Sequence, residues 1–504
     1  MATTPQTAYP CLNGPLQVDI AVIGGGITGL TTALLLLQQG ASVAVVEADR
    51  IAASTTGYTT ANLSSLHGLT YASFARHHGE EHAGRYGEAN EAAIRKVFEL
   101  CKHNGIRCDL EPMPAYTYAL DRKLLGEIEQ EVEVAQRLGL PASFTTRTDL
   151  PFQIAAAVRF DHQAMFHPRK YCLGLADVIV KEGGHLLEQT PALEIRADGT
   201  STSVKTPKGS IRADHAVQAT QMPFHDPFGF FTANFPSHSY GIAVPTEDRQ
   251  PGGMYLSADT PTRSIRPYSD GQQNYVIVGG EGHRVGKHNA TRQRYDVLQR
   301  WANSYFGPAK AAFRWSAHDY VSADGRPYIG RLTPESDRLW VATGFKKWGL
   351  TNGTVAAMIL SDRIGGRQNM WAKTFDSTRL EPKSSTKKLL SRQAELAQRS
   401  AEHRIVAVSV PEANNLARGE GRVFASGESK VVAYRDDQGE LHAASGVCTH
   451  MGCEVAFNGA DKTWDCPCHG SRFDTHGGVI HGPATNDLEP VCLLGIVAEQ
   501  RKDS

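Results

Sequence analysis

The sequence lacks the features that would place it in a membrane, outside the cell or on nucleic acid. The apolar run around Leu30–Leu37 is too short to span a bilayer. The N-terminal residues 1–14 contain neither a basic segment nor a twin-arginine pair, so no export signal is indicated. The formal net charge is −1, which implies no bulk attraction to nucleic acid or to anionic lipid. We therefore expect a soluble, cytoplasmic enzyme without a membrane anchor.

Repeats and familiar hydrolytic sets are also missing. We find no internal repeat, and neither a Ser-His-Asp set nor a pair of carboxylates stands out by spacing. The chain has 504 residues, 41% hydrophobic and 21% charged, which is typical of an ordinary globular protein with two or three domains. Of the nine cysteines, Cys101 and Cys108 flank a polar turn, and we expect them to be reduced cytosolic thiols.

Two short boxes near the C-terminus concentrate cysteine and histidine. The first box places Cys448 two residues before His450, and the second places Cys466 three residues before His469. Two thiolates and two imidazoles suit a [2Fe-2S] cluster in which two His ligands replace two Cys ligands on one iron. Imidazole ligands raise the reduction potential, so the boxes predict one-electron transfer. The alternative is a structural zinc site, because Cys and His pairs also hold zinc tetrahedrally.

The two boxes, C-T-H-M-G-C and C-P-C-H-G-S, resemble those of the Rieske domain, and the similarity covers residues 404–504. The resemblance implies a small all-β domain that holds a [2Fe-2S] cluster. It implies that one iron is bound by Cys448 and Cys466 and the other by His450 and His469. The remaining pair, Cys453 and Cys468, matches the disulfide of cytochrome bc-type Rieske proteins. High-potential relatives often carry Tyr at the position of Phe473, which argues against a very high potential here.

A different cofactor pattern lies at the front of the chain. The apolar run Val18–Ile23 reads as a buried parallel strand, and Leu30–Gln38 is compatible with a helix. Between them lies a G-x-G-x-x-G turn made by Gly24, Gly26 and Gly29. A second strand, residues 41–46, ends at Glu47, where a ribose-binding carboxylate is expected. The pattern predicts a dinucleotide site with the helix N-terminus at the phosphates, although a glycine turn in an ordinary α/β unit is the alternative. The motif does not separate FAD from NAD.

Three further segments resemble FAD-dependent oxidoreductases of the D-amino acid oxidase superfamily, over residues 17–370. They are Thr55–Leu63, Leu339–Phe345 and Trp348–Thr354. The resemblance implies a Rossmann-like FAD domain of the GR2 type with an antiparallel-sheet substrate domain, an α/β fold that precedes the all-β domain. We expect non-covalent FAD, because residues 54–60 contain neither His nor Cys. The cofactor contacts that the resemblance implies, beyond the first motif, are Thr56, Gly57, Thr60, Ala192, Gly344, Gly349, Leu350 and Thr351.

The expected domain layout is discontinuous. The FAD-binding parts are residues 17–90, 150–220 and 320–370, and the substrate-capping parts are residues 91–149 and 221–319. Residues 371–403 are expected to be a linker, with a basic polar run over Pro382–Arg404 that reads as a solvated helix. A nucleic-acid role for that run is the alternative.

The two cofactors together predict an oxidoreductase. Relatives oxidise C–N bonds of amines and amino acids, so we expect a small amine or amino-acid-like substrate at FAD and an external one-electron acceptor or redox partner. One alternative is an electron-transfer module that loads a partner oxygenase, and another is an oxygen-using oxidase with a structural cluster. The catalytic residues are unknown, and Lys347, Tyr268 and Arg266 could equally be core aromatics or surface cations. Other candidates for the substrate face are Tyr240, His283 and Trp348.

Overall fold

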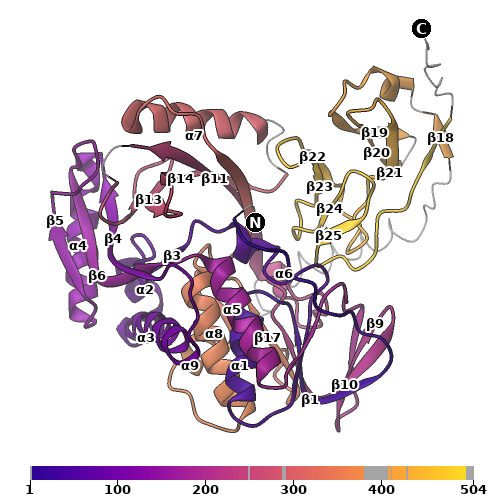
Figure 1. Cartoon of the computed structure of the whole chain (residues 1–504), viewed down its shortest axis with the longest axis horizontal. Helices are drawn as coiled ribbons and strands as arrows, with labels where there is room; N and C mark the ends of the chain where they lie inside the picture. The colour runs from indigo at the N-terminus through magenta and orange to yellow at the C-terminus, as the bar shows by residue number, and fades with distance from the viewer. Residues whose placement is uncertain are drawn as a thin grey trace. The chain divides into compact units, whose positions relative to one another are not determined.

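The N-terminal strand–glycine–helix–strand pattern supplies central strands of a mixed sheet (Figure 1). The computed structural model describes residues 3–247, 250–286, 291–379, 407–409, 411–426 and 429–494. Strand β1 (Leu16–Ile23) lies between β2 (Val43–Val46) and β10 (Gly209–Gln218) and runs parallel to both. The β2 residues are buried throughout, as expected for an apolar strand inside a parallel sheet.

The other strands of this first sheet come from distant parts of the chain. The order is β16-β17-β10-β1-β2-β7, and β9 joins β8 to the sheet through β10. Their bounds are β7 (His185–Leu187), β8 (Glu194–Ala197), β9 (Thr202–Thr206), β16 (Tyr328–Arg331) and β17 (Leu339–Thr343). In this mixed sheet, β17, β10, β1, β2 and β7 run parallel, and β16, β9 and β8 add antiparallel pairs. The expected strands within residues 183–188 and 211–220 are therefore present as β7 and β10.

Apolar helices pack together beside this sheet. Helix α1 (Ile27–Leu37) contacts both α5 (Pro168–Lys181) and α8 (Gly349–Ile364), as Figure 1 shows. Helix α3 (Glu80–Asn104) contacts α8 and α2 (Tyr71–His78). The other helices and turns before residue 380 are η1 (Thr55–Tyr58), η2 (Arg122–Leu124), α4 (Leu125–Arg137), α6 (Phe230–Ala233), α7 (Thr291–Phe306), α9 (Ala372–Phe375) and η3 (Ser377–Arg379).

A second sheet, mostly antiparallel, follows the order β15-β11-β14-β13-β12-β4-β6-β3, with β5 paired to β6. The β4–β12 pair runs parallel. The bounds are β3 (Asn62–Leu63), β4 (Glu111–Ala119), β5 (Ala142–Thr145), β6 (Ala156–Met165), β11 (Asn234–Thr246), β12 (Met254–Ser257), β13 (Arg263–Ser269), β14 (Asn274–Arg284) and β15 (Phe313–Ser322).

The second sheet also takes in strands from ranges that we expected to be FAD-binding parts. Residues 62–63 and 156–165 lie in ranges that we assigned to the FAD-binding part, but they form β3 and β6 of the second sheet. Strand β6 pairs with both β4 and β5, so it is an interior strand of the second sheet. The apolar pattern of a buried strand would be the same in either sheet. The sequence pattern alone therefore does not show which of the two sheets the strand joins.

Residues 371–379 do not behave as a linker either. Phe375 in α9 is fully buried, and the Arg379 guanidinium forms an ion pair with Asp324, with Nε 2.9 Å from Oδ2. Ser377 Oγ donates a hydrogen bond of 2.6 Å to the carbonyl oxygen of Arg331. The apolar and arginine side chains therefore hold this segment on the first unit. The rest of the expected linker, from residue 380 on, and the basic run within it lie outside the described residues.

The C-terminal region forms small β-sheets around its own core. The first of these sheets pairs β18 (Ala407–Ser409) with β26 (Cys492–Leu494). A second has the order β19-β20-β21, and a third has the order β22-β23-β24-β25. The remaining bounds are η4 (Pro411–Asn415), β19 (Gly421–Ser426), β20 (Ser429–Arg435), β21 (Leu441–Ser445), β22 (Ala456–Asn458), β23 (Thr463–Asp465), β24 (Arg472–Phe473) and β25 (Val479–His481). Trp464 and Phe473 are fully buried at the centre of this core.

Contacts divide the chain into two units. The first comprises Met1–Asn234, His238–Gly282 and Arg294–Leu380, and the second comprises Phe235–Ser237, His283–Gln293 and Glu381–Ser504. Residues 283–293, which we expected in the capping part, therefore group with the C-terminal unit. Over the described part of the chain, no helix combines the length and the apolarity that crossing a membrane requires.

Candidate cofactor sites

The turn after β1 requires glycine at two positions. Gly24 has a φ of +112°, and a Cβ atom on it would lie 2.5 Å from the carbonyl oxygen of Ala219. A Cβ atom on Gly29 would lie 1.9 Å from the carbonyl oxygen of Gly24, so α1 packs directly on the turn. Both approaches are too close for any side chain. These two glycines therefore shape the turn itself.

Gly26 has a different role, because it leaves space at the start of α1. A Cβ atom there would meet only Thr56 Oγ1, at 3.1 Å. Gly26 is the N-cap of α1 and supplies no side-chain hydrogen bond, while the Ile27 N–H donates to Thr56 Oγ1 at 3.3 Å. The first N–H groups of a helix attract phosphate through their partial positive charge. The turn and helix start therefore fit the pyrophosphate of a dinucleotide.

Glu47 follows β2 and faces the same turn. Its carboxylate accepts hydrogen bonds from the Gly25 N–H at 2.7 Å and from the Asp49 N–H at 3.0 Å. Burial raises the pKa of this carboxyl above its ordinary value, although the backbone donors act in the opposite direction. The acceptor thus lies beside the glycine turn, where the sugar of the cofactor is expected.

The late glycine block meets the first motif. Helix α8 begins at Gly349, and a Cβ atom on Gly353 would lie 2.6 Å from Thr28 Oγ1 in α1. Gly344 has a φ of +77°, and a Cβ atom there would lie 2.6 Å from Asn234 Oδ1. Segments that are more than three hundred residues apart therefore converge at the N-terminal ends of α1 and α8.

The other predicted cofactor residues are placed as follows. Thr56 and Gly57 lie in η1, and the carbonyl oxygen of Thr60 accepts a hydrogen bond from Arg266 Nε. Leu350 and Thr351 are buried in the first turn of α8. The Thr351 hydroxyl donates to the carbonyl oxygen of Ser64 at 3.2 Å, so its side chain is committed to an internal contact. The last of these residues, Ala192, packs against the core on the β9–β10 side of the first sheet.

A strained turn carries two lysines between β17 and α8. Lys346 has a φ of +51° and Lys347 a φ of +69°, a left-handed conformation that is costly for residues with side chains. The buried Asp319 carboxylate accepts hydrogen bonds from the Lys347 N–H, from the Tyr320 N–H at 2.8 Å and from Gln221 Nε2 at 3.2 Å. Burial raises the pKa of Asp319 above its ordinary value. This carboxylate holds the lysine turn in place.

The environment of the two lysines differs from that of an ordinary surface cation. Desolvation by the surrounding protein lowers the pKa of both ammonium groups, and Asp319 opposes this effect at Lys347. The Lys347 side chain nevertheless remains exposed, so water still reaches it. Strained backbone of this kind clusters at active sites and ligand-binding segments. The turn is therefore the best candidate for the substrate side among the residues predicted from sequence.

Arg266 and Tyr268 have structural surroundings. Arg266 is buried, donates to the Pro267 carbonyl oxygen at 3.0 Å, and has its pKa lowered to about 10 by desolvation. Its guanidinium lies 5.7 Å from the centre of the Tyr268 ring. Tyr240 is buried against Tyr295, and His283 belongs to the second unit. Lys347 and Trp348 thus lie directly before α8, whereas the Arg266 guanidinium donates to the carbonyl oxygens of Thr60 and Pro267.

Sequence reasoning missed His67 and Asp319. The His67 ring stacks on Trp348 with ring centres 4.4 Å apart, and its Nδ1 lies 2.6 Å from the Tyr86 hydroxyl. Burial lowers the pKa of His67 to about 3, so the ring is neutral at physiological pH. Both residues lie far in sequence from the lysine turn, and no spacing pattern links them to it. The one signal for Asp319 in the sequence is an acidic residue inside a strand segment, β15, that is rich in apolar and aromatic residues.

In the second unit, the two cysteine–histidine boxes fold into loops of the same kind. In the first, the Cys448 N–H donates to the Cys453 carbonyl oxygen at 2.8 Å, and the Gly452 N–H donates back to the Cys448 carbonyl oxygen at 2.9 Å. In the second, the Cys466 N–H donates to the Ser471 carbonyl oxygen at 2.8 Å, and the Gly470 N–H donates to the Cys466 carbonyl oxygen at 3.0 Å. Gly452 and Gly470 have φ values of +72° and +78°. Glycine at the fifth position of each box allows the same tight loop.

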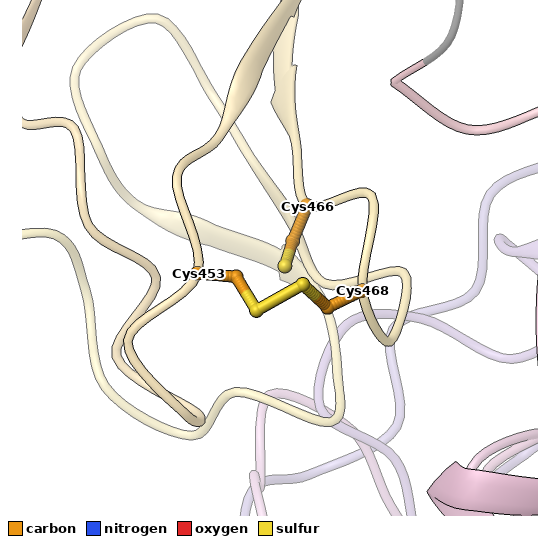
Figure 2. Close-up of side chains that lie close together, drawn as sticks. All are labelled: Cys453, Cys466 and Cys468. Atoms are coloured by element: carbon orange, nitrogen blue, oxygen red, sulfur yellow. A yellow bond between two sulfur atoms is a disulfide. The ribbon is translucent and has the colours of Figure 1, made fainter. Parts of the chain in front are cut away.

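A disulfide joins the two loops. Cys453 and Cys468 are bonded, with 6.4 Å between their Cα atoms, and Figure 2 shows the Cys466 side chain beside them. The pairing that the resemblance implied is thus present in the structure. Because the two loops are connected covalently, the four expected cluster ligands are held near one another.

The chemistry of these four side chains fits a mixed cluster. The buried thiols of Cys448 and Cys466 hydrogen-bond each other, which lowers the pKa of Cys448 to about 7 and raises that of Cys466. The rings of His450 and His469 lie 5.0 Å apart, edge to face. Burial lowers the pKa of His450 to about 4, which favours the neutral imidazole that ligates metal. Two thiols and two imidazoles from facing loops match the Rieske ligand set.

Arg472, next to the second loop, ties that loop to the neighbouring strand. Its Nε donates to Asp465 Oδ1 at 3.1 Å, and its Nη2 donates to Asp461 Oδ2 at 2.8 Å. The guanidinium is largely buried between these carboxylates. Arg472 therefore braces β24 against β23, and sequence reasoning did not assign it this role.

Comparisons with known proteins agree with both sites. A family model described as FAD dependent oxidoreductase matches residues 19–363, and one described as Rieske [2Fe-2S] domain matches residues 406–492. The chain is 33% identical over 492 residues to YhfW of Bacillus subtilis (strain 168), which its name calls a Rieske 2Fe-2S iron-sulfur protein; the match covers 97% of this chain and 96% of that protein.

Two other similar proteins match the front of the chain. The gamma-glutamylputrescine oxidoreductase of Escherichia coli (strain K12) is 24% identical over 390 residues, which cover 73% of this chain and 88% of that protein. The structure of glycine oxidase from Geobacillus kaustophilus superimposes with a TM-score of 0.63 at 17% identity, covering 73% of this chain and 100% of the other. The latter similarity establishes the fold.

Proposed function

Because the chain belongs to the family of FAD dependent oxidoreductases and carries a Rieske [2Fe-2S] domain, we propose that it oxidises a C–N bond of a small amine or amino-acid-like compound and delivers the electrons singly to an external acceptor. FAD accepts two electrons from a substrate, whereas a [2Fe-2S] cluster carries one at a time. The observation that carries the proposal is the presence of both cofactor cradles in one chain. We also propose that the enzyme acts in the cytoplasm. Its net charge of −1 gives no bulk attraction to nucleic acid, so we propose no role there.

We assign the FAD pyrophosphate to the turn made by Gly24, Gly26 and Gly29, and the ribose to Glu47. The close approaches at Gly24 and Gly29, together with the space at Gly26, support this assignment. We propose that the flavin is bound non-covalently. We also assign residues from Gly344 to Thr351 to the flavin. This assignment is supported by the close approach of the following residue Gly353, in α8, to α1.

We assign the cluster to Cys448 and Cys466 on one iron and to His450 and His469 on the other. The matched loops, the buried thiols and the bridging disulfide support this set. On the substrate side, the Lys346–Lys347 turn offers two cations at the start of α8, where a substrate with an acidic group would find a partner. The name of the Escherichia coli relative, a gamma-glutamylputrescine oxidoreductase, supports an amine as the substrate class.

An anaerobic reduction screen tests the direction of electron flow. The holoenzyme is mixed without oxygen with amines and amino acids in one series and with NADH or NADPH in the other, and flavin absorbance is followed. We expect an amine or amino acid to bleach the flavin and NAD(P)H to leave it oxidised. Bleaching by NAD(P)H alone would contradict the proposal and favour an electron-transfer module that loads a partner oxygenase.

A ligand variant tests the relay. His469→Cys is expected to lower the cluster potential or to lose the cluster, because a thiolate places more negative charge on the iron than imidazole does. Anaerobic flavin bleaching should stay nearly intact, while turnover with a one-electron acceptor should slow. His476→Gln, outside both boxes, is the matched control and should behave like the parent. If His469→Cys turned over as fast as the parent with that acceptor, the cluster would have only a structural role.

A further inference from the structure

A second pair of cysteines lies close together in the first unit, among residues that neither cofactor assignment uses. The sulfur atoms of Cys101 and Cys108 are 3.5 Å apart and share a hydrogen bond. A disulfide requires about 2.05 Å between sulfurs, so a shift of roughly 1.5 Å would join them. The two thiols are therefore positioned to form a disulfide when an oxidant is present. Neither the flavin nor the iron-sulfur cluster requires this bond.

The backbone around the pair allows such a shift. Cys101 is in the last turn of α3, which ends where Gly105 adopts a left-handed φ of +65°. The Ile106 N–H donates to the Cys101 carbonyl oxygen at 2.9 Å, which turns the chain back toward Cys108. Cys108 is anchored separately, because its carbonyl oxygen accepts the His167 N–H at 2.7 Å. Since the end of a helix frays more readily than its middle, Cys101 is the partner that can move.

The pair also lies just below the surface. Cys101 keeps 8% of its surface exposed and Cys108 keeps 2%, and each has an exposed neighbour along the chain, Lys102 and Arg107. Cys172, in the same core, has no exposed surface. Either sulfur can donate the hydrogen bond that they share, but Cys101 is the more exposed of the two and lies at a helix end, so we take its sulfur as the attacking one. An oxidant that approaches from solvent therefore meets Cys101 before Cys108.

We propose that Cys101 and Cys108 form a peroxide-oxidised dithiol that closes to a reversible disulfide. The Cys101 sulfur attacks one oxygen of a hydroperoxide, the O–O bond breaks, and a sulfenic acid forms with release of water or alcohol. The Cys108 sulfur then attacks the Cys101 sulfur, the S–O bond breaks, and a second water leaves. The two thiols together lose two electrons and two protons, and the peroxide accepts both.

Peptide mapping of the unmodified sequence tests this directly. The holoenzyme is reduced without oxygen, treated with graded hydrogen peroxide, alkylated in acid and cut with trypsin. Trypsin cleaves after Lys102 and Arg107, so a Cys101–Cys108 bond would join two otherwise separate peptides, residues 97–102 and 108–122. We expect this linked pair, lighter than the sum of its thiol forms by about two hydrogens. It should appear at or below the peroxide dose that oxidises the exposed thiol of Cys492.

Variants assign the roles of the two sulfurs. Cys108→Ser should leave a sulfenic acid on Cys101 that a dimedone probe captures, and Cys101→Ser should form neither product. Cys172→Ser is the matched buried control and should still form the linked peptides. The proposal is wrong if both thiols of the parent remain fully alkylated at doses that oxidise Cys492. It is also wrong if Cys108, and not Cys101, is the residue that dimedone labels.

Discussion

The Asp319 carboxylate accepts the backbone N–H of Lys347, a contact that joins β15 to the turn before α8. Asp319 is buried, while the lysine turn it holds is left-handed at two successive residues. A buried acceptor that binds a strained turn in this way stabilises a conformation the turn would not keep alone. Removing the Asp319 carboxylate should therefore disturb the conformation of the Lys346–Lys347 turn more than it disturbs the packing around residue 319.

We expect Asp319→Ala to slow anaerobic flavin reduction by substrate at least tenfold, because the lysine turn loses its acceptor. Loss of hydrogen bonds to a charged group should also lower the free energy of unfolding by about 2 kcal/mol. Stopped-flow absorbance and thermal melting measure the two effects. The control is Asp337→Ala, whose side chain is 75% exposed in a surface ion pair with Arg331. Equal effects of the two variants would show that Asp319 has no special role.

Gly26→Val should remove the flavin while leaving the fold intact. A Cβ atom at Gly26 meets only the Thr56 hydroxyl, so the added side chain occupies the space assigned to the pyrophosphate. The purified variant should lack the yellow colour of bound flavin, with an unchanged far-UV spectrum. Gly126→Ala, where a Cβ atom meets nothing within 4 Å, should keep full flavin content. In the parent, acid precipitation should release the flavin; flavin that stays on the precipitate would disprove non-covalent binding.

Cys466→Ser should abolish the cluster, because serine supplies no thiolate to the iron. The parent should contain about two irons per chain and give a low-average-g EPR signal on reduction, as expected for mixed His and Cys ligation. Cys492→Ser, at an exposed thiol in the same unit, should keep both iron and signal. Zinc in place of iron in freshly purified, active parent would overturn the assigned cofactor.

Cys453→Ser should loosen the two cluster loops without removing a ligand. The disulfide closes a segment with a sequence separation of 15, and its loss should cost about 2–4 kcal/mol of unfolding free energy in the second unit. Iron should then be released to a chelator at a lower temperature than in the parent, and Cys468→Ser should reproduce the effect. Finding Cys453 and Cys468 as free thiols in intact holo-protein would contradict the bonded pair.

The local cofactor patterns could be recognised from sequence because each one depends on neighbours along the chain. The strand before Gly24, the helix after Gly29 and the acid at Glu47 all follow within one βαβ unit, whose backbone geometry constrains glycine and carboxylate positions. The two boxes likewise carry their own loop geometry, since glycine at the fifth position of each permits the left-handed turn. Short-range sterics therefore made both cofactors and the strand pattern of β1, β2 and β10 predictable.

Only the tertiary structure showed features that require contacts between residues far apart in the sequence. Strand β6 joined the second sheet because its hydrogen-bond partners β4 and β5 lie there, and alternation of buried residues does not identify a partner strand. Residues 371–379 stayed on the first unit because Phe375 found a core and Arg379 found Asp324. Asp319 and His67 reached the start of α8 through chain reversals that no spacing encodes. Local turns follow directly from the sequence, because the steric limits of neighbouring residues set them. Contacts between distant side chains depend on the free energy of the whole packed unit, and a local pattern does not reveal them.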